Sequence, residues 1–330
     1  MTQPFNSLFI ALLFVLLPNQ RLMANKCPTT LERFYLKAFY KPNEAWARIM
    51  QRAVEVGLEH LQNHPRTSLQ NILKVMIDYA QPNLKIRAYS GTISSDQQIN
   101  SENHALLFGV LRKGGQRGTA IYNQKPMSAF KELATTNLKR FGKETVENGV
   151  FGPAGKDYGK PYKINHHDWQ HQYDTPSGRI NLCTVSSEWY ESHSIKSITV
   201  PYGSVSITSP TIDVIPQMLE AANQVFIKLR TLKTKIDQGK VQKDAATLKE
   251  VIDSVAEIEW ILSQTWPYGR GSGGIADLTT KVIFDWFGIN TPVFKVNTNP
   301  NIVALITPLA EFQQSYPTLF RKKPNWNYPD

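Results

Sequence analysis

The chain has 330 residues, of which 41% are hydrophobic and 11% aromatic, and its formal net charge is +10 at pH 7. A chain of this length and composition can bury one large core or two smaller ones, which excludes an intrinsically disordered protein. The positive charge suits acidic proteins, anionic lipid or nucleic acid as partners without choosing among them.

Residues 1–24 have the pattern of a secretory signal peptide. Residues 8–17 form an uncharged apolar run that is too short to span a bilayer comfortably, and Ala24 offers a small residue for cleavage. Residues 1–7 lack the lysine or arginine that usually precedes such a run. We predict a cleaved signal, with a membrane anchor as the alternative. The mature protein would then be secreted or periplasmic, without a stable transmembrane span.

The chain has two cysteines, Cys27 and Cys183. In an oxidising compartment they could form a disulfide that closes a long loop and stabilises the fold. The alternative is two unpaired thiols, with Cys183 buried. The sequence leaves both possibilities open.

Residues 25–141 are predicted to form an N-terminal region of helical and mixed structure. Helices are expected over residues 30–40, 43–61, 68–80 and 127–141, and a strand over residues 84–89. The helices follow from apolar residues at spacings of three and four, and the strand follows from alternation of apolar and polar residues.

Residues 142–193 are predicted to form a long polar loop region, which is either mobile or functional. It contains His166, His167 and His171, the densest group of possible metal ligands. His167 and His171 would share one face of a helix and are the weak candidates for a metal site, with a polar surface loop as the alternative. These histidines, or His193, could also supply a base if the loop folded over a binding site.

Residues 194–300 are predicted to form a helical domain that opens with a hairpin, and residues 301–330 a C-terminal tail. Residues 195–207 alternate around Tyr202 and Gly203, as in a β-hairpin. Asp213 can then cap a long helix. A basic surface follows near the end of that helix, made of Lys228, Arg230, Lys233, Lys235, Lys240 and Lys243.

Residues 266–274 form a glycine-rich loop between two predicted apolar helices. Glycine-rich backbone at a helix N-terminus can aim several N–H groups at one point, where the helix dipole favours an anion. The predicted anion-binding residues are Arg270, Gly271, Ser272, Gly273 and Gly274. In the alternative interpretation the glycines only let two helices reverse direction and Ser272 caps the second helix. Both interpretations remain open.

The order of hairpin, long helix, second helix, glycine-rich loop and third helix resembles the Fic/Doc family over residues 194–300. The loop of that family reads His-Pro-Phe-x-Asp/Glu-Gly-Asn-Gly-Arg-x-x-Arg. Pro267, Gly271 and Gly273 agree with it, and Tyr268 stands for the phenylalanine. The resemblance implies a nucleotide-dependent transferase fold in which Tyr202 and Gly203 belong to a flap that positions a target segment.

The departures from that family lie where its chemistry would be. Trp266 occupies the place of the catalytic histidine, and an indole has no basic nitrogen at neutral pH. Arg270 replaces the acid that would hold magnesium, and Ser272, Gly274 and Asp277 replace the asparagine and both phosphate-binding arginines. We therefore assign no catalytic residue and no cofactor, and leave open whether the chain is an enzyme.

The sequence thus predicts a mainly α fold with a small β component, in which an N-terminal mixed region precedes a helical bundle with a hairpin flap. The predicted function is that of an exported effector or toxin whose loop binds a phosphate or nucleotide-like anion and which acts on a target protein. The alternative is a non-enzymatic binding protein that uses the hairpin and the basic surface. Nucleic acid is not expected as a partner, because exported proteins rarely meet it.

Overall fold

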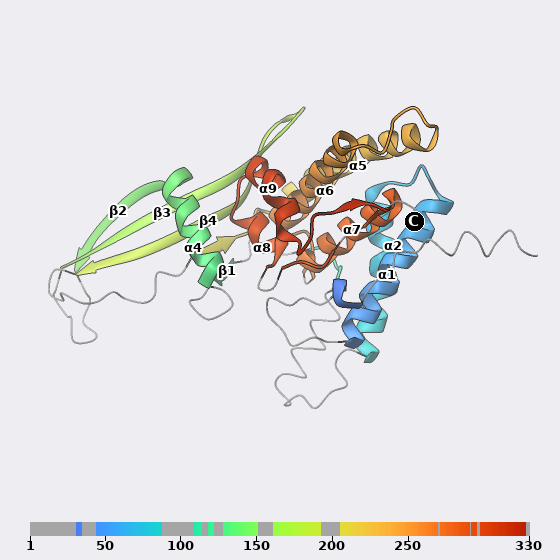
Figure 1. Cartoon of the computed structure of the whole chain (residues 1–330). Helices are drawn as coiled ribbons and strands as arrows, with labels where there is room; N and C mark the ends of the chain where they lie inside the picture. The colour runs from blue at the N-terminus through green and yellow to red at the C-terminus, as the bar shows by residue number, and fades with distance from the viewer. Residues whose placement is uncertain are drawn as a thin grey trace, which may run out of the picture.

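The computed structural model describes residues 31–34, 44–87, 108–113, 118–121, 128–150, 161–192, 205–269, 271–290, 292–295 and 298–327. Within these residues a body of packed helices lies beside an antiparallel sheet whose long strands extend away from it (Figure 1). The predicted fold class, mainly α with a small β component, is confirmed.

The helical body consists of five long helices and four short ones. The long helices are α1 (Glu44–Asn63), α2 (Leu69–Arg87), α5 (Val214–Asp237), α6 (Ala245–Thr265) and α7 (Ser272–Phe287). The short ones are η1 (Leu31–Phe34), α8 (Pro300–Leu305), α9 (Leu309–Ser315) and η2 (Tyr316–Leu319). The two-residue strands β6 (Ile289–Asn290) and β7 (Asn325–Trp326) pair at its edge.

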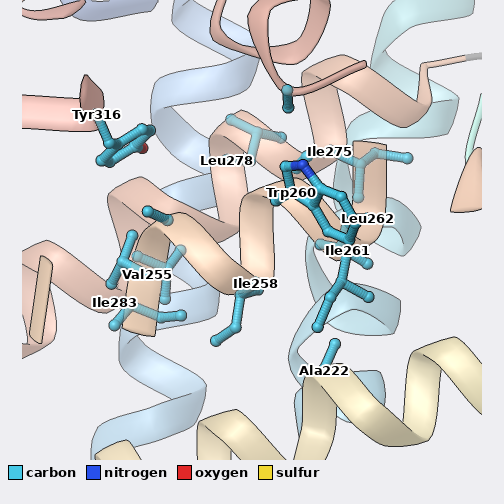
Figure 2. Close-up of a cluster of buried hydrophobic side chains, with 14 of the residues drawn as sticks. Ala222, Val255, Ile258, Trp260, Ile261, Leu262, Ile275, Leu278, Ile283 and Tyr316 are labelled. Carbon is cyan, nitrogen blue, oxygen red and sulfur yellow. The ribbon is translucent and has the colours of Figure 1, made fainter. Parts of the chain in front are cut away.

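Helix α6 is the centre of this body. Every residue from Ile258 to Thr265 is buried, so its last two turns are covered on all sides. Figure 2 shows Trp260, Ile261 and Leu262 of α6 among apolar side chains from α5 and α7. An amphipathic surface helix would leave one face exposed along its whole length, whereas α6 does so only before Ile258.

The sheet has five strands in the order β1-β5-β4-β3-β2, and every neighbouring pair is antiparallel. The strands are β1 (Gly118–Ile121), β2 (Lys143–Val150), β3 (Pro161–Thr175), β4 (Gly178–Ser192) and β5 (Val205–Thr208), and helix α4 (Ser128–Phe141) packs on β3 and β4. The prediction of a loop over residues 142–193 is wrong, because this stretch contains three of the strands. Most side chains of β3 from His166 to Thr175 are polar, so this strand lacks the alternation of apolar and polar residues that an antiparallel strand usually shows.

Several predicted elements can be compared with the structure directly. The helices predicted over residues 43–61, 68–80 and 127–141 are confirmed as α1, α2 and α4. The strand predicted over residues 84–89 is wrong, because α2 continues through Pro82 to Arg87 and buries Leu84. Asp213 stands at the start of α5 as predicted, but its side chain makes no capping hydrogen bond.

Four successive main-chain carbonyls at the end of α8 join the sheet to the helical body. Ala304 O accepts from Gln264 Nε2 at 2.8 Å, Leu305 O from His171 Nε2 at 3.0 Å, Ile306 O from Asn137 Nδ2 at 2.7 Å and Thr307 O from Trp260 Nε1 at 2.9 Å. Carbonyls at the end of a helix have no partner inside it. Donors from α4, β3 and α6 satisfy them here, which fixes three elements at one point.

Candidate functional site

Residues 266–274, which we call the α7 loop, reverse the chain between α6 and α7 through two left-handed residues. Trp266 ends α6 at φ 49°, and Gly271 precedes α7 at φ 82°. A left-handed conformation costs a residue with a Cβ about 1–2 kcal/mol. Trp266 is the one non-glycine residue with positive φ among those described. The packing around the loop must therefore hold it in this shape.

Main-chain hydrogen bonds from the 108–113 segment hold the first half of the α7 loop. The Arg112 N–H donates to Pro267 O at 2.9 Å, and the Gly269 N–H donates to Val110 O at 2.8 Å. This part of the loop is therefore fixed before any ligand arrives.

The Ser272 hydroxyl closes the loop on itself. Its Oγ accepts from the Tyr268 N–H at 3.0 Å and donates to the Tyr268 carbonyl at 3.2 Å. The structure gives α7 no side-chain cap, so the suggestion that Ser272 caps this helix is wrong. The sequence could not distinguish the two roles, because both place a serine at the start of a helix.

Close packing explains two of the glycines in the loop. A Cβ on Gly271 would lie 2.4 Å from the Phe108 ring, and one on Gly273 would lie 2.7 Å from the Asn301 side chain. On Gly274 the nearest atom would be in the Trp46 ring, 3.9 Å away, which is an ordinary contact. The structural interpretation therefore accounts for Gly271 and Gly273 but not for Gly274.

Three amides at the start of α7 precede the helical hydrogen-bond ladder. Its first bond runs from the Ile275 N–H to Gly271 O at 2.8 Å, so the N–H groups of Ser272, Gly273 and Gly274 have no acceptor inside the helix. The first turn has no acidic residue, and both glycines are half-buried. The turn thus has the polarity to receive an anion. The fifth predicted residue, Arg270, lies outside the described residues.

Helix α7 also carries a buried stripe of charge that the sequence analysis did not identify. Asp277, Lys281 and Asp285 follow one another at helical spacing of four. Lys281 pairs with Asp277, with side chains only 4% and 13% exposed, and Asp285 pairs with Arg33 of η1 at 3.0 Å. The sequence could have revealed this stripe, because it places three charges at this spacing in an otherwise apolar helix.

Glu259 of α6 lies next to this stripe and is fully buried. Its Oε2 accepts a hydrogen bond from the Tyr316 hydroxyl, and its Oε1 has no partner. Burial, and secondarily the Asp277 carboxylate, raise the pKa of Glu259 to about 8, against the opposing effects of Tyr316 and Lys281. The interior is too enclosed for catalysis, and we interpret this network as structural.

The three histidines of the predicted metal group lie on β3, and each has a different neighbouring group. His171 is buried, and its Nε2 donates to Leu305 O, while His166 and His167 lie 3.6 Å and 3.9 Å from Glu147 and Glu144 of β2. Burial lowers the pKa of His171 to about 3, so it is neutral. Across the described residues no group of three or more His, Cys, Asp or Glu could hold a metal ion.

Other predicted site residues cannot be compared with the structure. Tyr202, Gly203, His193 and Cys27 lie outside the described residues, as does the predicted signal peptide. Cys183 is a buried free thiol whose Sγ donates to Gln264 O at 2.9 Å, and burial raises its pKa.

The basic surface at the end of α5 is partly engaged in the fold. Arg230 donates to Arg66 O and Thr67 O, and Lys233 pairs with Asp237. Cations are favourable at the carbonyl end of a helix without any partner.

Comparison with known proteins gives a similarity over residues 214–323. This third of the chain, which spans α5 to η2 and includes the α7 loop, matches the AvrB_AvrC family, whose description is avirulence protein. No curated protein matches the chain. In the part of the chain that the structure describes, no helix is both long and apolar enough to cross a membrane.

The resemblance to the Fic/Doc family is wrong, because the family that matches this region is a different one. Packing explains most of the residues that agree with the Fic/Doc loop pattern. Gly271 and Gly273 face Phe108 and Asn301 too closely for a side chain, and Tyr268 is buried. The description of the matched family agrees with the effector part of the predicted function and does not support nucleotide transfer.

Proposed function

We propose that the protein is an exported effector that binds a phosphate-bearing ligand at the first turn of α7. The avirulence description of the matched family supports the effector role. The observation that carries the ligand is the uncapped first turn of α7: its three leading amides precede the helical hydrogen-bond ladder, and the turn has no side-chain cap and no acidic residue.

The hydrogen bonds that hold the described part of the α7 loop support this proposal. An anion site gains affinity when its donors need no rearrangement, because the ordering cost is met in folding. The bonds to the 108–113 segment and the Ser272 hydroxyl provide that order. A Cβ on Gly274 would make only an ordinary contact with the Trp46 ring, so this is the less crowded side from which a ligand would approach. By its charge, Arg270 would strengthen anion binding.

Two substitutions at Gly274 test the proposal. Gly274→Pro removes one donor, and proline is tolerated in the first turn of a helix, while Gly274→Ala adds a Cβ and keeps the donor. We expect calorimetric titration with inorganic phosphate and AMP to show binding that survives Gly274→Ala and weakens at least fivefold in Gly274→Pro. Arg270→Ala should weaken it as well.

Lys235→Ala is the control, since it removes an exposed positive charge far along the chain from the loop. Equal losses in Lys235→Ala and Arg270→Ala would indicate only general attraction of anions to a basic protein. Equal binding by the two Gly274 variants would show that the α7 amides do not bind the anion. Circular dichroism and melting of each variant separate loss of binding from loss of fold.

A further inference from the structure

Strand β2 forms one edge of the five-stranded sheet. It pairs with β3 from Lys143 opposite Asp168 to Val150 opposite Pro161 with no shift of register, and the described sheet has no strand on its other side. In an antiparallel pair, successive residues turn their N–H and C=O groups alternately toward the partner and away from it. Half of the peptide groups of β2 therefore point outward.

Several of the usual protections of an edge strand are missing from β2. Edges are commonly short, or interrupted by proline, a bulge or several lysines. β2 is eight residues long with one lysine and no proline, and the register shift of β3 lies on its β4 side, between Gln170 and Gln172. The opposite edge strand, β1, has only four residues.

The outer edge is also exposed and acidic. Residues 143–148 are all exposed, including Val146 at 48%. The side chains of Glu144 and Glu147 are 58% and 60% exposed, and each lies beside one histidine of β3. Because side chains alternate between the two faces of a strand, Glu144 and Glu147 lie on opposite faces, and each face of this edge carries one carboxylate on a chain whose net charge is +10.

We propose that β2 is a docking edge for an extended segment of a partner protein that carries lysine or arginine. The segment adds as a further strand, with affinity from main-chain hydrogen bonds and selectivity from Glu144 and Glu147. The long strands extend away from the helical body, and β2 lies on the outer side of this extension (Figure 1). A second copy of the chain fits poorly, because it would bring another Glu144 and Glu147 to the same edge and join two positively charged molecules.

The test uses fluorescence anisotropy with labelled peptides of about eight residues made of lysine, valine and threonine, in which lysines three residues apart place a positive charge on each face of the added strand. A matched peptide carries N-methyl groups on every second residue, which blocks strand pairing and keeps the charge. A third peptide has glutamate in place of lysine. We expect the full-length protein to bind the basic peptide at least tenfold more tightly than either of the others. Attraction to the net charge alone would favour the acidic peptide.

Substitutions then locate the site. Glu144→Lys and Glu147→Lys should together weaken the basic peptide at least fivefold, whereas Glu250→Lys, an exposed control on α6, should leave binding unchanged. Equal binding of the N-methylated peptide, or no binding of the basic peptide, would overturn the proposal. So would dimers in solution that Glu144→Lys disrupts. The peptide comparison uses the unmodified protein and stays decisive if a variant misfolds.

Discussion

At the scale of single residues, Glu259 decides the charge balance of the helical core. Buried with it are two other acids, Asp277 and Asp285, and two bases, Lys281 and Arg33. The group is neutral only if one acid carries a proton. Glu259 is that acid, because its pKa is raised to about 8 and the other two acids each have a basic partner.

A protonated Glu259 makes the stability of the protein depend on pH in a defined direction. The folded chain holds this proton up to about pH 8, whereas the unfolded chain releases it near the ordinary value of 4.5. The contribution to the free energy of unfolding is therefore complete below pH 4.5 and is lost as the pH rises to about 8.

The variant Glu259→Gln removes this titration and keeps the shape of the side chain and the acceptor for Tyr316. We expect the stability of the variant relative to the wild type to rise by up to about 1.4 kcal/mol for each pH unit between about pH 5 and pH 8, because only the wild type loses the contribution of a bound proton there. Urea unfolding at several pH values measures the difference. A difference that does not change with pH would show that Glu259 is not protonated in the fold.

Two glycines of the α7 loop should respond differently to the same substitution. Gly271→Ala is expected to cost about 2–4 kcal/mol, from a left-handed backbone at φ 82° and from overlap with the Phe108 ring. Gly274→Ala should change stability by less than about 1 kcal/mol, because its Cβ meets nothing closer than 3.9 Å. Urea unfolding measures both. Similar costs for the two would contradict the described packing.

At the scale of elements, α7 combines three features that differ in how far the sequence could reveal them. Its position was predictable, because Ile275, Leu278 and Val282 repeat at helical spacing. Its loop contacts were not, since Phe108 and Asn301 come from segments far away in sequence. The buried ion pair with Arg33 depends on a similar long-range contact.

The sequence did not predict the sheet, because its strands are too polar to stand out from a loop. In β3, most side chains from His166 to Thr175 are polar, and His171 is the only buried residue among them. Such strands lack the run of apolar residues that distinguishes a strand from a loop. Pairing between β3 and β4 supplies the order, and pairing is not visible in either segment alone.

The joint between β3 and α8 can be tested at His171. The substitution His171→Phe removes the donor to Leu305 O and leaves a buried carbonyl without its partner, so we expect a loss of about 1–3 kcal/mol near pH 7. Hydrogen exchange should speed up in β3 and β4. His166→Phe, on the same strand but outside the joint, is the control and should leave the exchange of both strands unchanged.

The loss of stability caused by His171→Phe should become smaller as the pH falls below about 6.5. The pKa of His171 is lowered to about 3 in the fold, so between the ordinary value of 6.5 and about 3 only the unfolded chain takes up the proton. The wild type is therefore destabilised across this window as the pH falls, and a variant without the imidazole is not. A loss that grew as the pH fell would contradict a neutral, buried His171.

At the scale of the whole molecule, the helical body and the sheet differ in what they offer a partner. The body contains the region similar to avirulence proteins, together with the α7 loop, and the sheet contributes the acidic edge of β2. The predicted division into domains at residues 141, 193 and 300 stays a prediction. The carbonyls of residues 304–307 nevertheless tie the sheet firmly to the body.

The most direct test of the anion site is a two-dimensional amide NMR titration of the full chain with inorganic phosphate. We expect downfield shifts of the Ser272, Gly273 and Gly274 amide protons that follow one binding curve, because these three donors precede the helical ladder. Unmoved signals from these amides, with shifts confined to the basic surface of residues 228–243, would contradict this expectation.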